Sequence, residues 1–560
     1  MTIGSFLKKW MKRLLIAAFV LFTLGVLLVV FENWRAKRDW HAYKAEWEAK
    51  GERFDRAAFL PPDVPDDQNI AATPLLAPLL HWEPEPLDPL SHLGKPPLPE
   101  AITDGVVKVC DWLRLVGVGG GFMESRLSKL QLGAPLAGGV DTNMMKRYGL
   151  APTPAPSEPP VTQETKQKGA KPVGASQAMP STEEIEAVLA NPERSVAANV
   201  LAVFDRFSAQ MNELATAAKR PCLVLSDPGQ YDPVPKLLTG FGVLKPVVQA
   251  FRVRALARLA EHESAGAVAD VKTILRLNQA MRSEPLLITG LVRVAFLSIA
   301  LQPVWEGLAR HAWDDAQLRE LEQMLSQVNF VSESAEMLRA ERAYSLRVLD
   351  LMLRSPGELG QSQSEVLQLG IPSGRGLLHR LLPAVIYRNE LAIARMYQED
   401  LLARLDTDRQ AVDVVGLWAA DTDPAIRTLK KQALLRPYSA MADAMLPAVA
   451  SSTEKFTLIH AYVVLARVAC ALERHRLADG DYPADLQALV PDYLPALPAD
   501  PAGGGVLFYR RLSANNFLLY SGGPNARDDG GKIVRRDNPN HGADPRNEKS
   551  DWVWTYPSGE

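Results

Sequence analysis

The fold of this chain is indicated most clearly by residues 241–281, FGVLKPVVQAFRVRALARLAEHESAGAVADVKTILRLNQAM. Apolar residues recur at helical spacing on both sides of a short turn near 262–266, which predicts two helices that fold back on each other. The helical spacing continues through most of 183–450, where alternating runs are nearly absent. We therefore expect a mainly α protein with a central domain of helical hairpins.

Several helices of this central domain can be placed individually. Residues 283–313 form a long apolar stretch that carries Arg293 and Gln302, which indicates a buried core helix rather than a membrane span. The acidic pair DD at 314–315 is typical of a helix start. Further helices are expected at 332–354, 377–405 and 424–434.

A separate apolar run lies near the N-terminus. Residues 14–31, LLIAAFVLFTLGVLLVVF, contain no charge. As a helix, 18 residues span about 27 Å, close to the hydrocarbon thickness of a bilayer. Trp10 and Trp34 flank the run, where indole rings favour the membrane interface. A cleavable signal peptide would have a shorter core and an A-x-A-like site. We therefore predict an uncleaved transmembrane helix whose partner is the lipid bilayer.

The charges around this helix bear on its orientation. More basic residues precede the run than follow it, which favours a short cytoplasmic tail. We expect a single-pass protein of the inner (cytoplasmic) membrane, with its bulk on the periplasmic or extracytoplasmic side. The basic residues before the run are Lys8, Lys9, Lys12 and Arg13, and those after it are Arg35, Lys37 and Arg38.

The composition of the chain limits the kinds of partner and of cysteine chemistry that it can have. The 560 residues carry 62 basic and 65 acidic side chains, a net charge of −3, so we expect no nucleic-acid partner. The cysteines Cys110, Cys222 and Cys470 form no C-x-x-C pair and are predicted to be buried thiols, although one disulfide stays open for an exported chain.

The chain divides into five predicted parts. Residues 1–50 hold the tail, the transmembrane helix and its helical extension. Residues 51–150 are a loop-rich Pro/Gly segment that packs on the helical domain, and 151–182 are a disordered linker with almost no large apolar residue. Residues 183–450 are the α-helical domain, and 451–560 are a small α+β domain.

The α+β domain has a clear element order. A helix from about Thr453 ends at Gly480, and strands are expected at 506–511, 516–521 and 551–557. Short turns between the first two strands predict an antiparallel sheet.

The order of motifs in this part resembles the globular half of the major pseudopilin of type II secretion. The shared motifs are a helix before the "YP" of 482–483, then "LPADP" (497–501), then a small sheet. The resemblance covers about 100 residues. The whole chain also resembles a family of uncharacterised, single-pass membrane-anchored bacterial proteins that carry "PLLAPL", "EPLL…LVRVA" and "DWVW" in this order.

The pseudopilin resemblance implies a calcium site in the loop that follows the second strand. Calcium takes six to eight oxygen ligands, and the loop SGGPNARDDGG (521–531) is rich in them. The alternative is a loop capped by its own side chains, because Asn, Asp and Gly are the usual residues of turns. The candidate calcium ligands are Ser521, Asn525, Asp528, Asp529 and Asp551.

Sequence patterns for catalysis are missing. No HExxH, GxSxG, Walker A or HxH pattern occurs, so no residue is predicted to be catalytic or to bind a cofactor. We expect a non-enzymatic, membrane-anchored scaffold or interaction protein of the bacterial envelope, related to secretion, with other envelope proteins as partners. The alternative is an envelope hydrolase with its site in a cleft of the helical domain.

Overall fold

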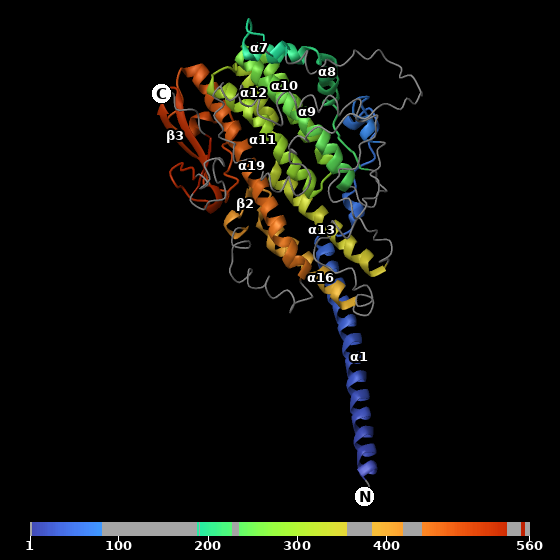
Figure 1. Cartoon of the computed structure of the whole chain (residues 1–560). Coiled ribbons are helices and arrows are strands. Elements are labelled where there is room, and N and C mark those ends of the chain that lie inside the picture. The colour runs from blue at the N-terminus through green and yellow to red at the C-terminus, as the bar shows by residue number, and fades with distance from the viewer. Residues whose placement is uncertain are drawn as a thin grey trace, which may run out of the picture.

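The chain is mainly helical, as predicted. In the computed structural model, 68% of the structure is helix and 6% is strand. A long N-terminal helix projects from a body of packed helices, and a small sheet lies at the side of that body (Figure 1). The structure describes residues 3–80, 187–189, 191–226, 234–354, 383–417, 440–534 and 550–554.

The N-terminal helix α1, Ile3–Ala49, is continuous. Its most apolar window has no buried residues, whereas Ala36, Trp40 and Tyr43 farther along are buried against the body. Two other helices, α11 and α19, are also long and apolar enough to cross a membrane, but most of each is buried within the body. The exposed apolar helix predicted at the N-terminus is therefore confirmed.

The helical body contains α7 to α13 and α16. The long helices α9 and α10 pack against each other, and α11 packs on both. His262 and His311 adopt positive φ values of 60° and 53° where α9 and α11 end. Asp314 and Gln317 form a capping box at the start of α12. The bounds are α7 Val196–Asp205, α8 Ser208–Ala217, α9 Val234–Ala260, α10 Ser264–Ala280, α11 Leu287–Ala309, α12 Asp315–Ser326, α13 Phe330–Arg354 and α16 Pro383–Arg395.

The predicted helix 377–405 is altered at its end. Regular α-helix stops at Arg395 and continues as the π-helical η8, Met396–Leu401, and the 3₁₀ turn η9, Leu402–Arg404. A hairpin of β1, Leu405–Asp406, and β2, Ala411–Val412, follows and was not predicted. Two-residue strands carry no detectable alternation. The predicted helix at 424–434 and the linker at 151–182 lie outside the described residues.

The helix α19, Ala440–Asp479, crosses the whole body (Figure 1). Its predicted start near Thr453 was wrong, because the helix continues through Pro447, a residue that usually favours a break. It ends where predicted, at Gly480, whose φ is +87°. The predicted boundary between 183–450 and 451–560 lies inside this helix.

The C-terminal sheet has the order β3-β4-β5 and is antiparallel throughout. Leu519 on β4 pairs with Trp554 on β5, and both are buried against α19 as part of the main core. The strand β3 forms one edge of this sheet. The bounds are β3 Phe508–Ser513, β4 Asn516–Ser521 and β5 Trp552–Trp554.

Two apolar cores hold the described chain together. The larger joins α7 to α12 with α19 and the sheet. The second joins Trp40 and Tyr43 of α1 with α13, α16 and α19. The extension of the apolar helix is therefore part of the folded body. Cys222 and Cys470 are free thiols, Cys470 being buried, and Cys110 lies outside the described residues.

Candidate functional site

The junction between α1 and the body is held by a network of hydrogen bonds and ion pairs. Glu52, just after α1, accepts hydrogen bonds from Arg339 Nε at 3.1 and 3.2 Å and from Arg342 Nη2 at 2.7 Å. Arg342 Nη2 also donates to the backbone oxygen of Arg53 at 2.8 Å, and Nη1 donates to Gln398. We call Glu52, Arg339 and Arg342 the Glu52 clamp.

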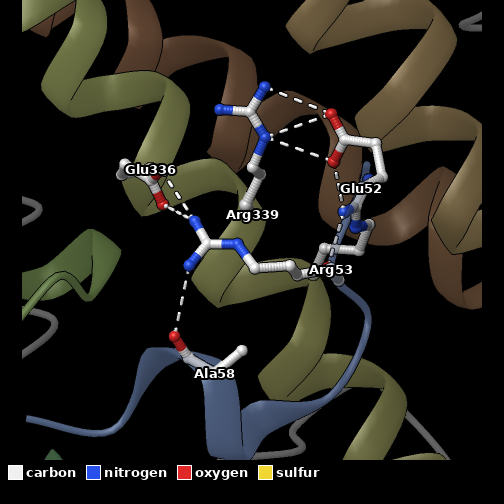
Figure 2. A network of polar contacts seen from close by, with 6 residues as sticks. Glu52, Arg53, Ala58, Glu336 and Arg339 are labelled. Atoms are coloured by element: carbon white, nitrogen blue, oxygen red, sulfur yellow. Dashed lines mark hydrogen bonds and ion pairs between the residues drawn. The ribbon is translucent and has the colours of Figure 1, made fainter. Parts of the chain in front are cut away.

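Figure 2 shows Glu52 facing Arg339, with Arg53 reaching across to Glu336 and to the carbonyl of Ala58. The two ion pairs differ in burial. The Arg342 side chain is 0% exposed and Glu52 is 11% exposed, whereas Arg53 and Glu336 are 46% and 48% exposed. The Glu52–Arg342 pair is therefore shielded from water, whereas Arg339, at 28% exposed, lies at the rim of the clamp.

Electrostatics keep the clamp charged. Burial would raise the pKa of Glu52, but the hydrogen bond from Arg342 and the charge of Arg339 outweigh it and lower the pKa. Burial lowers the pKa of Arg342, and Glu52 partly offsets this. A guanidinium stays protonated at biological pH. Arg342 also lies over the Phe54 ring, 4.1 Å from its centroid, so the cation is held on both sides.

A row of further contacts joins α1 to α16 below the clamp. Asn33 Oδ1 accepts the backbone N–H of Ala384 at 2.9 Å and so caps the start of α16. Arg388 bridges Asp39 at 3.1 Å and Glu32 at 3.6 Å. These contacts begin directly after the apolar run, so the body starts at the end of the span.

A cavity of about 490 Å³ lies beside this row, between α1, η1 (Arg56–Phe59), α13 and α16. Its wall combines cations with aromatic rings, and we call it the α1 pocket. Its residues are Lys37, Trp40, His41, Lys44, Phe54, Asp55, Arg56, Ala343, Leu346, Arg347, Asp350, Tyr387 and Glu390. The sequence patterns did not indicate this pocket, because its walls come from four distant segments.

The predicted calcium ligands are placed in separate contacts. The Ser521 hydroxyl donates to Asp500 Oδ1 at 2.7 Å, and the Asn525 amide donates to Asp529 Oδ2 at 2.8 Å. Asp528 Oδ1 accepts from the Tyr520 hydroxyl at 2.7 Å. Within the described ranges, no three His, Cys, Asp or Glu side chains are grouped as a metal ion would require.

Asp551, the fifth candidate, is buried behind the loop. Its Oδ2 accepts the backbone N–H groups of Gly531 at 2.7 Å and Lys532 at 3.2 Å, while its buried Oδ1 accepts no hydrogen bond from the described residues. Burial raises the pKa of Asp551, and the charge of Asp529 adds to the rise. Most of the loop's oxygens are thus engaged within the loop, whereas Asp551 Oδ1 is not.

Asp500 was missed as a site residue. It is buried, its Oδ2 accepts the Gly522 N–H at 2.8 Å, and its Oδ1 accepts the Ala502 N–H at 2.9 Å. Burial raises its pKa, and the charge of Asp551 raises it further. The signal was present in the motif LPADP, whose aspartate is this residue.

The corner at Tyr482–Pro483 is tied to the helical body by Glu473 of α19. Glu473 is fully buried and accepts hydrogen bonds from the Tyr482 hydroxyl at 2.7 Å and Arg476 Nη2 at 2.7 Å, and contacts His311 Nδ1 at 2.9 Å. Burial would raise the pKa of Glu473, but these partners lower it. The corner therefore docks on the end of α11 through one carboxylate.

Among the other groups with shifted pKa values are His460 and Glu341. His460 is buried on α19, and burial with the charge of Arg467 lowers its pKa to about 4. Burial raises the pKa of Glu341 to about 7, although a hydrogen bond from the Leu287 N–H acts in the opposite direction and lowers it. Neither residue lines the α1 pocket.

Comparison with family models, with curated proteins and with solved structures finds no match to this chain. The resemblance to pseudopilins thus rests on motif order alone and stays a prediction.

Proposed function

We propose that this chain is a membrane-anchored scaffold or interaction protein of the bacterial envelope, with its body on the extracytoplasmic side of the inner membrane. The observation that carries the proposal is α1. Its apolar window is exposed, and the same helix then enters the body's second core and the Glu52 clamp. An exposed apolar helix of this length is stable in lipid rather than in water.

The charges around the span support this orientation. Lys8, Lys9, Lys12 and Arg13 directly precede the span, and Arg35, Lys37 and Arg38 directly follow it. The positive-inside rule counts Lys and Arg rather than net charge, so this excess of one before the span favours a cytoplasmic N-terminus.

Surfaces for partner proteins lie in the C-terminal part. An apolar cavity of about 480 Å³ is lined by residues of α19, the 484–487 segment and the approach to β3. Val506 at its rim is 75% exposed. The strand β3 is a sheet edge, which can accept an extended segment of another protein. Hairpins in the helical domain would offer further grooves.

The pseudopilin-like role of residues 451–560 and a calcium ion in their loop are parts of the same proposal. Asp551 Oδ1 supports the ion, because a buried carboxylate oxygen without a hydrogen bond is a suitable calcium ligand. To join Asp551 around an ion, Ser521, Asn525, Asp528 and Asp529 would first have to leave their present hydrogen bonds, because the described residues form no preassembled ligand cluster.

Fractionation with protease protection tests the central claim. The full chain, tagged at its C-terminus, is expected in the membrane fraction after a carbonate wash. Proteinase K added to spheroplasts should remove the tag while a cytoplasmic marker stays intact. A chain released by carbonate would refute the anchoring, and a tag protected until lysis would refute the orientation.

Affinity purification tests the interaction role. The chain is captured from detergent-solubilised membranes, and the co-purified proteins are identified by mass spectrometry. We expect specific envelope proteins whose recovery falls with Val506→Glu but not with Ala478→Glu, which adds the same charge at an exposed residue of α19 outside both the cavity and β3. Recovery of no specific envelope protein would contradict the role.

A further inference from the structure

We propose that the α1 pocket binds the phosphate-bearing headgroup of an anionic membrane lipid, from the leaflet in which α1 emerges. This inference rests on the proposed anchoring of α1. It adds a ligand class and a site to that proposal, and it concerns a pocket whose walls are α1, η1, α13 and α16.

The position of the pocket along α1 places its Lys37 end at the membrane surface. Lys37 follows Phe31, the last residue of the apolar run, by six positions, and a helix rises about 1.5 Å per residue, so the two are about 9 Å apart along the axis. Headgroups extend roughly 5–8 Å beyond the hydrocarbon of each leaflet. The Lys37 end of the pocket is therefore adjacent to the headgroups.

The direction of α1 brings its side chains closer still. Side chains on a helix lean toward its N-terminus, which for α1 is the membrane end. Lys37, His41 and Lys44 lie at one-turn intervals on the pocket wall and so lean toward the lipid. The pocket extends from Lys37 near the headgroups to Lys44, about 10 Å farther from the membrane at 1.5 Å per residue.

The wall has a small excess of positive charge, and Lys44 on it pairs with Glu48 at 3.6 Å, so the cation at the membrane end, Lys37, is the one that favours an anion. Lys37, Lys44, Arg56 and Arg347 are the cations, and Asp55, Asp350 and Glu390 are the carboxylates. Asp55 accepts the Ala57 N–H at 3.0 Å, and Asp350 pairs with Arg347 at 3.2 Å. Lys37 forms no ion pair with any residue in the described ranges, so its charge is available.

The aromatic residues suit the same ligand. Trp40 is 6% exposed and packs edge-on against Phe54, and the His41 and Tyr387 rings are 6.1 Å apart. Ligand pockets are commonly lined by apolar and aromatic side chains with a few polar groups that orient the ligand. A volume of about 490 Å³ lies within the range of ligand pockets, about 300–1,000 Å³.

Native mass spectrometry of the full chain in a nonionic detergent tests the inference. Phosphatidylglycerol and phosphatidylcholine are offered at equal concentration, and the lipid-bound fractions are compared for the wild type, Lys37→Gln and Arg38→Gln. Arg38 is the matched control, because it is the next residue on the same exposed stretch of α1 and does not line the pocket.

We expect the wild-type protein to retain phosphatidylglycerol in preference to phosphatidylcholine. Lys37→Gln should reduce its retention about fivefold, since one cation near an anionic lipid contributes about 1 kcal/mol. Arg38→Gln should change it less than about twofold, because Arg38 does not line the pocket and its charge is already paired with Asp39 at 3.2 Å. Circular dichroism checks that both variants fold. Equal losses in both variants, or no preference in the wild type, would overturn the inference.

Two further arms identify the source of the phosphate. Inorganic phosphate and glycerol 3-phosphate are added at millimolar concentration to the lipid-bound protein. Lipid should remain bound, and its displacement by either soluble anion would overturn the lipid assignment in favour of a free-phosphate site. If the chain is found in the membrane but fails these tests, only this inference fails. If carbonate releases the chain, the anchoring itself fails.

Discussion

Replacing Glu52 with glutamine tests whether α1 is locked to the body by the buried clamp. The substitution keeps the shape of the side chain but removes the charge that faces Arg339 and the fully buried Arg342. Removing one partner of a buried ion pair costs about 3–5 kcal/mol, because the remaining charge stays buried. With Gln398 and the Arg53 carbonyl still accepting from Arg342, we expect the lower end, about 3 kcal/mol.

The assay is thermal unfolding of the full chain in detergent, followed by circular dichroism. At about 2–4 °C per kcal/mol for domains of 150–250 residues, a loss of about 3 kcal/mol should lower the melting temperature by roughly 6–12 °C. The matched control is Glu336→Gln, which removes an equally short ion pair, 2.7 Å to Arg53, between half-exposed side chains. Such pairs contribute about 0–1 kcal/mol. If the two variants melt within about 2 °C of each other, which corresponds to less than about 1 kcal/mol, the reasoning from burial is refuted.

Four other predictions follow from the buried groups. Glu473→Gln should lower the free energy of unfolding by about 3 kcal/mol and increase the rate of amide hydrogen exchange at the Tyr482 corner. The control Asp479→Asn, at an exposed residue, should lower it by under about 1 kcal/mol. Equal losses in the two variants would contradict the role of Glu473. The pKa of His460 is lowered to about 4, so its contribution to stability is present above its ordinary pKa and is lost as the pH falls. Between pH 7 and pH 5 the free energy of unfolding should fall by about 2 kcal/mol because of His460. Urea unfolding of His460→Gln at both pH values should lack this fall. A variant with the same pH dependence as the wild type would be inconsistent with a neutral buried ring. Glu341, with its pKa raised to about 7, has the opposite sign: its contribution is present at low pH and is lost as the pH rises through 7, by about 2–3 kcal/mol from pH 5 to pH 8. Glu341→Gln should therefore be relatively more stable at pH 8 than at pH 5, and the reverse order would refute the assignment. Calcium at 100 times its dissociation constant should stabilise the wild type by about 2.7 kcal/mol and Asp551→Asn much less, and no shift at millimolar calcium would leave the self-capped loop as the account of residues 521–531.

The sequence predicted those elements whose signals are local. The apolar run at 14–31, the strand at 516–521 and the helix end at Gly480 depend on neighbouring residues alone, and the structure places them as expected. The start of α19 was placed too late, at about Thr453: the helix continues through Pro447 and packs against four other helices, contacts that a local pattern does not contain.

The candidate sites depend on long-range contacts, which single-sequence patterns do not contain. Glu52 and Arg342 are 290 positions apart, and nothing near Glu52 marks it as buried. The α1 pocket draws its walls from segments equally far apart. Asp500 differs, because its motif was visible, but only the fold reveals that its carboxylate faces Ser521 and Gly522.

Because α1 is one unbroken helix, a change in its tilt moves the body with it. A helix of 47 residues is about 70 Å long at 1.5 Å per residue. The clamp and the Asn33 cap fix the body to its upper part. A thinner bilayer would tilt the helix to keep its apolar run covered. The body would then lean by the same angle, so membrane thickness would set how far the sheet at its side stands from the lipid surface (Figure 1).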